Sequence, residues 1–129
     1  MRNVTLIIAK GLSANSGLKR FGIGWNGLAQ DGAKAFFKVL KDNECLEELD
    51  LSNNRIATEG AVYIAKGLSA NTALKSIKMA MNPMESAGCF SIIKGRLFGG
   101  TERIQKGVQY TSIDLFCICS SQSGSTNIK

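Results

Sequence analysis

Three leucines recur at intervals of 28 residues, and each opens the same pattern of side chains. The leucines are Leu18, Leu46 and Leu74. Apolar residues follow each leucine after three, five and ten positions, and an asparagine follows after eight. The copies are Phe21, Ile23, Asn26 and Leu28; Leu49, Leu51, Asn54 and Ile56; and Ile77, Met79, Asn82 and Met84. Agreement across three copies restricts the chain to an internally repeated architecture.

The spacing L-x-x-L-x-L-x-x-N-x-L is the signature of a leucine-rich repeat, at the long end of the range of about 20–29 residues for such repeats. The octapeptide IAKGLSAN occurs at 8–15 and again at 64–71. The repeat therefore extends toward the amino terminus. We assign residues 1–98 to a repeat domain, with a half repeat at 1–17 and repeats at 18–45, 46–73 and 74–98.

Each repeat begins with alternation of buried and outward residues, as in a short strand, and continues with helical spacing. The clearest helical sets are Ala33, Phe36, Phe37 and Leu40, and Ala61, Ile64, Ala65 and Leu68. Neither element can bury its apolar side without neighbouring repeats. We predict an α/β fold, a short right-handed leucine-rich-repeat solenoid with parallel strands on the concave side and helices on the convex side.

Asparagines recur at two positions where the scaffold explains them. One set follows the strands, where an inward amide can bond peptide groups of neighbouring turns. The other follows the helices, where a left-handed residue commonly closes the last turn. The sets are Asn26, Asn54 and Asn82, and Asn15, Asn43 and Asn71. Their periodic placement favours structural roles over catalytic ones.

Composition excludes several classes of partner. The formal net charge is +6, but the 16 basic and 10 acidic residues are interleaved, with no basic patch carrying aromatic residues. We therefore expect no nucleic-acid partner. No apolar run reaches membrane-spanning length, and Val4 to Ala9 is too short for a usual signal sequence. The four cysteines follow no paired spacing, which favours thiols and a cytoplasmic location.

The residues that enzymes usually need are missing. The chain has no histidine, the commonest general base and zinc ligand. Cys117 and Cys119 form a C-x-C pair without a second pair, and no phosphate-binding glycine loop follows a strand. We expect no enzyme activity, metal, cofactor or small-molecule substrate.

Outward residues of the strands and of the turns after them form the candidate protein-binding set. The eight candidates are Lys19, Arg20, Trp25, Glu48, Asp50, Asn53, Lys78 and Met81. The middle strand is acidic and both neighbours are basic. This alternation favours cross-strand charge pairing, and it is compatible with a mixed-charge recognition strip.

Trp25 is the only tryptophan and occupies the position of Asn53 and Met81 in the other copies. Packing at the edge of the repeat is one interpretation. If exposed, Trp25 would be a natural anchor for a protein interface, because tryptophan dominates such sites.

Two stretches resemble a particular family. LEELDLSNNRI and the segment NPMESAGCFSIIK at 82–94 are similar to the leucine-rich repeat-containing protein 74 family, of the ribonuclease-inhibitor-like class. The resemblance covers residues 1–94 and implies a curved scaffold for protein interactions. It carries over no catalytic or binding residues. Family members look longer at the amino end.

Repeat register fails after Lys94, since Glu102 stands where the next leucine is expected. We treat 99–129 as a divergent tail, with a possible degenerate strand at 110–117 that would cover the sheet edge and a disordered end at 120–129.

The sequence thus favours a non-catalytic protein-interaction scaffold that binds an unidentified protein on the concave strand face. One alternative is a truncated or alternatively spliced fragment without a binding role. A second, resting on fold analogy alone, is a GTPase-regulating solenoid.

Overall fold

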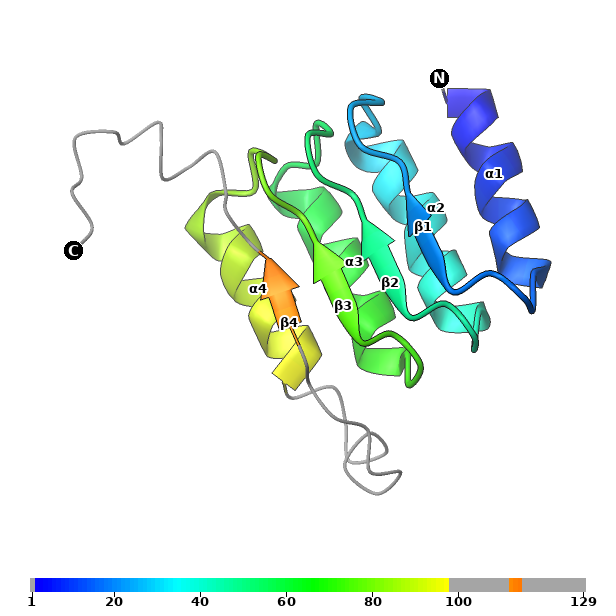
Figure 1. The fold of residues 1–129 in the computed structure, drawn as a ribbon. Coiled ribbons are helices and arrows are strands. Elements are labelled where there is room, and N and C mark those ends of the chain that lie inside the picture. The colour runs from blue at the N-terminus through cyan, green and yellow to red at the C-terminus, as the bar shows by residue number, and fades with distance from the viewer. Residues whose placement is uncertain (1, 98–111, 115–129) are drawn as a thin grey trace.

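Helices and strands alternate along the computed structural model, which describes residues 2–97 and 112–114, with side chains from residue 4 to residue 95 (Figure 1). The helices are α1 (Arg2–Ala14), α2 (Ala29–Asp42), α3 (Thr58–Ala70) and α4 (Glu85–Leu97). The strands are β1 (Arg20–Gly22), β2 (Glu48–Asp50), β3 (Ser76–Lys78) and β4 (Ser112–Asp114). Helix α1 comes first, with no described strand before it.

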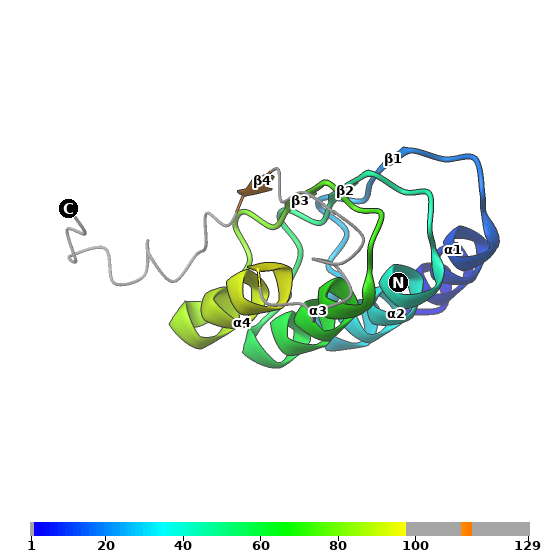
Figure 2. The same cartoon turned by 90° about the horizontal axis from the view of Figure 1, so that it is seen from below.

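The strands form one parallel sheet in the order β1-β2-β3-β4. Their register follows the sequence period, because Phe21 lies opposite Leu49 and Leu49 lies opposite Ile77. Strand β4 pairs with β3 through Ile113 and Ile77, which departs from the 28-residue spacing. The helices lie side by side on one face of the sheet (Figure 2). The predicted α/β class with a parallel sheet is confirmed.

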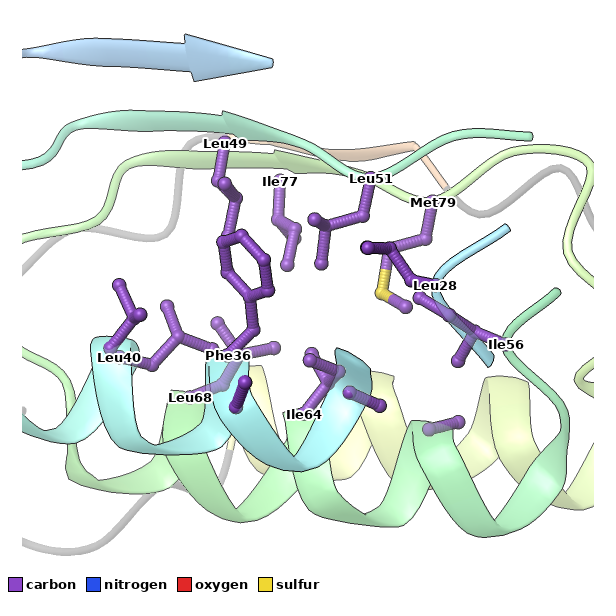
Figure 3. Packing of buried hydrophobic residues seen from close by; sticks show 14 of the residues in the cluster. Leu28, Phe36, Leu40, Leu49, Leu51, Ile56, Ile64, Leu68, Ile77 and Met79 are labelled. Atoms are coloured by element: carbon purple, nitrogen blue, oxygen red, sulfur yellow. The ribbon is translucent and has the colours of Figure 1, made fainter. Parts of the chain in front are cut away.

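A single core fills the space between sheet and helices (Figure 3). Fully buried strand residues at the repeating positions include Leu49, Leu51, Ile77 and Met79. The helices contribute Phe36, Leu40, Ile64 and Leu68. Each such burial stabilises the fold by about 1.5–3 kcal/mol. The sequence prediction of buried positions holds throughout the second and third copies.

In the first copy of the repeat, at the end of the sheet, two residues expected to be buried are partly exposed. Leu18 is 38% exposed and Phe21 is half-buried, whereas Leu46 and Leu49 are each 1% exposed. The described chain has no strand before β1, so nothing covers these side chains from that side. Full burial was the wrong expectation for Leu18. These two repeating positions are therefore buried as predicted only where other strands lie on both sides of their own.

The asparagines after the strands form a ladder between repeats. The Asn54 side-chain oxygen accepts hydrogen bonds from the backbone N–H of Asn26 at 2.9 Å and of Leu28 at 3.4 Å. Its amide nitrogen donates to the carbonyls of Ile23 and Leu51, at 3.1 and 2.9 Å. The next copy repeats the pattern, with the Asn82 oxygen accepting from Asn54 N–H at 3.0 Å. The predicted scaffold role of these residues is confirmed.

A second asparagine ladder lies at the helix ends, by a different mechanism from the one expected. Asn43 and Asn71 have φ of −84° and −85° and extended backbone, so the left-handed closure is wrong. Instead the Asn71 side chain donates to the carbonyls of Leu40 at 2.7 Å and Asn43 at 3.1 Å. Its oxygen accepts from the N–H of Leu74 at 2.6 Å. Each amide thereby ties the end of the preceding helix to the start of its own strand.

The cysteines do not all remain thiols. Cys45 is a free, half-buried thiol, and its Sγ lies 3.2 Å from the Asn15 carbonyl. Cys89 on α4 is disulfide-bonded. The expectation of thiols throughout is therefore wrong for Cys89. Cys117 and Cys119 lie outside the described residues.

Strand β4 falls within 110–117, where the sequence suggested a degenerate strand, and it occupies the edge of the sheet beside β3. The rest of the 99–129 tail, including the end at 120–129, lies outside the described residues.

Candidate protein-binding surface

Charged residues of adjacent strands pair across the outward face of the sheet. The Glu47 carboxylate lies 3.8 Å from the ammonium groups of both Lys19 and Lys75. The Arg20 guanidinium lies 3.1 Å from the Glu48 carboxylate. These pairs are largely exposed, so each contributes at most about 1 kcal/mol. The predicted cross-strand pairing is confirmed at two repeating positions, that of Lys19, Glu47 and Lys75 and that of Arg20 and Glu48.

Asp50 and Lys78 do not form an ion pair among the described residues. The Asp50 carboxylate instead accepts a hydrogen bond from the Ser52 N–H at 2.9 Å, while Lys78 is exposed. Gly22 occupies the same position in β1 and leaves room above the sheet. A shallow hollow of about 240 Å³ results, here named the sheet hollow, and its walls include Arg20, Gly22, Glu48, Asp50 and Lys78.

Trp25 lies in the turn after β1 with 81% of its surface exposed. The alternative of edge packing is therefore wrong. Its φ is +62°, in the left-handed region that bulky side chains disfavour. The equivalent residues Asn53 and Met81 have φ of +57° and +60°. The repeat thus imposes this conformation on whichever residue stands there.

Two of these turns form equivalent hydrogen bonds to the next repeat. The Trp25 N–H donates to the carbonyls of Ser52 at 3.3 Å and Asn53 at 3.1 Å, and the Asn53 N–H donates to the carbonyl of Ala80, the counterpart of Ser52, at 2.9 Å. Asparagine tolerates the left-handed region through its short polar side chain, whereas tryptophan and methionine do not. Trp25 therefore carries backbone strain that no burial of its ring offsets.

Trp25, Asn53 and Met81 line a second hollow of about 500 Å³, here named the turn hollow. Its walls are Trp25, Gly27, Asn53, Asn54, Arg55, Met81 and Pro83. Arg55 is exposed and is the one charged side chain among the described residues of this wall. Sequence reasoning missed Arg55 and Pro83. Both occupy the ninth position after their leading leucine, as Gly27 does, so the repeat period carried a signal for them.

Seven of the eight predicted residues divide between two neighbouring surfaces. Arg20, Glu48, Asp50 and Lys78 line the sheet hollow, and Trp25, Asn53 and Met81 line the turn hollow. Lys19 lines neither and pairs with Glu47 instead. The sheet hollow is mostly polar and charged, whereas Trp25, Met81 and Pro83 make the turn hollow mostly apolar.

Two observations on the described part of the chain concern metal ions and membranes. It contains no cluster of three or more His, Cys, Asp or Glu side chains able to hold a metal ion. Among the described helices, none has the length and apolarity needed to cross a bilayer.

These strand, turn and helix repeats define a leucine-rich-repeat fold. The Leucine Rich repeat family model matches residues 42–65, which include β2 and the start of α3. Among solved structures, the chain resembles leiomodin-1 actin-binding site 2 with a TM-score of 0.73 and 18% sequence identity. The match covers 89% of this chain and 63% of that chain. No curated protein matches the sequence.

Proposed function

We propose that this chain is a non-catalytic protein-binding module, built as a short right-handed solenoid whose concave strand face receives the partner. The observation that carries the proposal is Trp25, an exposed tryptophan in a strained left-handed turn beside Met81 and Arg55. Strained residues concentrate at functional sites. Exposed tryptophans, together with arginine, are enriched among the residues that dominate interface energetics.

The two hollows indicate which side-chain chemistry a partner should have. The turn hollow offers apolar contact from Trp25 and Met81 and one cation from Arg55. The sheet hollow beside it offers alternating charges that favour a polar segment in one orientation. A partner that places an apolar side chain near an acidic one matches the turn hollow. Its adjacent polar residues would lie along the strands.

Replacing Trp25 with asparagine should separate stability from binding. The change copies Asn53, which already occupies the left-handed position of the next repeat, so the free energy of unfolding should rise by about 1 kcal/mol. Binding should weaken about 30-fold, corresponding to a loss of about 2 kcal/mol for an anchor residue. Urea denaturation measures the first effect, and quantitative mass spectrometry of affinity-captured proteins measures the second.

Val62→Ala is a matched control, because Val62 is a 36% exposed apolar residue on α3. It should leave the captured set unchanged. Asp50→Lys tests the sheet hollow separately and should reduce capture by reversing a charge there. Identical captured sets for wild type, Trp25→Asn and Asp50→Lys would contradict binding through this surface.

Actin is a first purified partner to test, since the similar leiomodin-1 structure is described as an actin-binding site. That similarity concerns the fold. Cosedimentation with actin that Trp25→Asn weakens and Val62→Ala does not would support actin as the partner on this face. Cosedimentation unchanged by Trp25→Asn would place any actin contact elsewhere on the chain.

A cooperative thermal transition should distinguish a working module from an incompletely folded fragment. One core cluster extends from Ala9 of α1 to Ile92 of α4, so the repeats should unfold together. The helical circular dichroism signal, followed as the temperature rises, should fall in one sigmoidal transition. A gradual loss of signal would favour the fragment. No observation among the described residues favours the GTPase-regulating alternative.

A further inference from the structure

The outer face of α1 differs from the same face of every later helix. By the repeat period, Val4, Ile7 and Gly11 of α1 correspond to Gly60, Tyr63 and Gly67 of α3. In α3 these residues face α2. A Cβ on Gly60 would lie 3.1 Å from that of Ala33, and one on Gly67 would lie 2.8 Å from that of Leu40.

In α1 the same positions are open. Val4 is 50% exposed and Ile7 is 71% exposed, and a Cβ on Gly11 would meet nothing within 4 Å. Gly11 and Gly67 belong to identical octapeptides, so the difference comes from the missing neighbour and not from local sequence. The face is shaped to receive a helix, and no described element covers it.

The other end of the helix row exposes a second apolar surface. Phe90 and Ile93 of α4 are 65% and 40% exposed. Ile93 occupies the repeat position of Phe37, whose ring packs against Tyr63 of the next helix at 6.4 Å between centroids. Phe90 occupies the position of Val62, which lines the groove between α3 and α4. Both side chains therefore lie where a further helix would pack.

Among the described elements, a helix is outermost at one end of the repeat and a strand at the other. At one end, β4 lies beside β3 and no described helix follows it (Figure 1). At the other end, α1 has no described strand before it. Among the described strands, β1 and β4 each have one edge without a partner strand, and such edges are templates for further pairing.

We propose that two copies of this chain associate head to tail, with α1 of one copy packed on α4 of the next. β4 and the incoming α1 would together form one strand–helix repeat, and β1 of the second copy would pair with β4 of the first. The packing continues the α2–α3 and α3–α4 interfaces within the chain. Because the contact is heterologous and does not use the same face twice, it extends to chains of more than two copies.

Sedimentation velocity over a concentration series tests the assembly. The weight-average mass should rise from 13.8 kDa and pass twice that value without a plateau at the dimer. Ile7→Lys and Ile93→Lys should each weaken association at least about tenfold, a change of about 1.4 kcal/mol. Val62→Lys, a matched apolar-to-lysine change in the middle of the helix row, should leave association unchanged.

A mixture of the two variants distinguishes head-to-tail packing from other modes. The Ile7→Lys chain keeps an intact α4 face, and the Ile93→Lys chain keeps an intact α1 face. Their equimolar mixture should therefore form dimers that grow no further. Circular dichroism checks that each variant is folded, and Val4→Lys and Phe90→Lys replace any variant that is not.

A mass of 13.8 kDa at all concentrations would overturn the proposal. A dimer lost with Ile7→Lys and unaffected by Ile93→Lys would also overturn it, because that pattern belongs to α1 packed on α1.

Discussion

Replacing Asn54 with alanine should remove a large part of the stability of this protein. The side chain is 2% exposed and bonds backbone groups on two successive repeats. Alanine would leave the backbone N–H groups of Asn26 and Leu28 without this acceptor. The carbonyls of Ile23 and Leu51 would each keep another donor at 3.0 Å, the side-chain amides of Asn26 and Asn82. Since each buried group left unsatisfied costs about 1–3 kcal/mol, we expect a loss of about 2–6 kcal/mol. Single domains are stable by only about 5–15 kcal/mol.

Asn26→Ala is the matched control, because Asn26 is the end copy of the same ladder. Its half-buried side chain bonds only the carbonyls of Ile23 and Gly24, both in its own repeat. We expect a loss of about 1 kcal/mol, the usual net contribution of such hydrogen bonds. Urea denaturation measures both variants. Equal small losses would show that the ladder between repeats contributes little.

Gly11 and Gly67 should respond in opposite directions to the same substitution. Both lie in the octapeptide IAKGLSAN inside helices, so local sequence and helix propensity are the same. Gly11→Ala should raise the free energy of unfolding by about 0.5–1 kcal/mol, because alanine is the better helix former and the added methyl meets nothing. Gly67→Ala should lower it by about 1–3 kcal/mol through overpacking.

The cost at Gly67 arises from specific contacts. A methyl there would lie 2.8 Å from Leu40 Cβ and 3.2 Å from the Phe37 carbonyl oxygen. Relief would require α3 to move away from α2, because the carbonyl belongs to the backbone. Urea denaturation of the two variants and wild type measures the difference. The same sign for both substitutions would mean that α1 and α3 have equivalent surroundings.

Much of the fold could be predicted from the sequence, because each copy of the repeat places the same kind of residue in the same interaction. Leu49 and Ile77 are buried as predicted, and Asn54 bonds the neighbouring turn as predicted. One copy predicts another wherever both have the same neighbours. Leu18 fails this condition, because the described chain places no strand beside β1 on that side.

The helix-end asparagines show a different limit. Asn43 and Asn71 occupy a position that is often left-handed, yet both are extended. Their amides bond a helix end and a backbone carbonyl of the preceding repeat. Such partners are distant in sequence, and propensity at a single position contains no information about them.

Spacing in the sequence selected residues that line the two hollows, but it did not predict how those residues are arranged. Outward spacing selected Arg20, Glu48 and Trp25 from the alternation of the strand and the turn after it. It did not predict that Trp25 would be strained and exposed, or that Arg55 would share its hollow. Side-chain exposure in a turn depends on how neighbouring repeats stack, and that stacking is a tertiary property.

The amino-acid sequence was enough to predict the period, the alternation of strand and helix, most of the buried positions and the ladder of asparagines after the strands. These follow from local periodicity and from the need to satisfy buried peptide groups. The three-dimensional packing was needed to show which copies of a position have no described neighbour. Identical octapeptides are open at Gly11 and tightly packed at Gly67, because packing depends on the adjacent helix and not on the sequence of the helix itself.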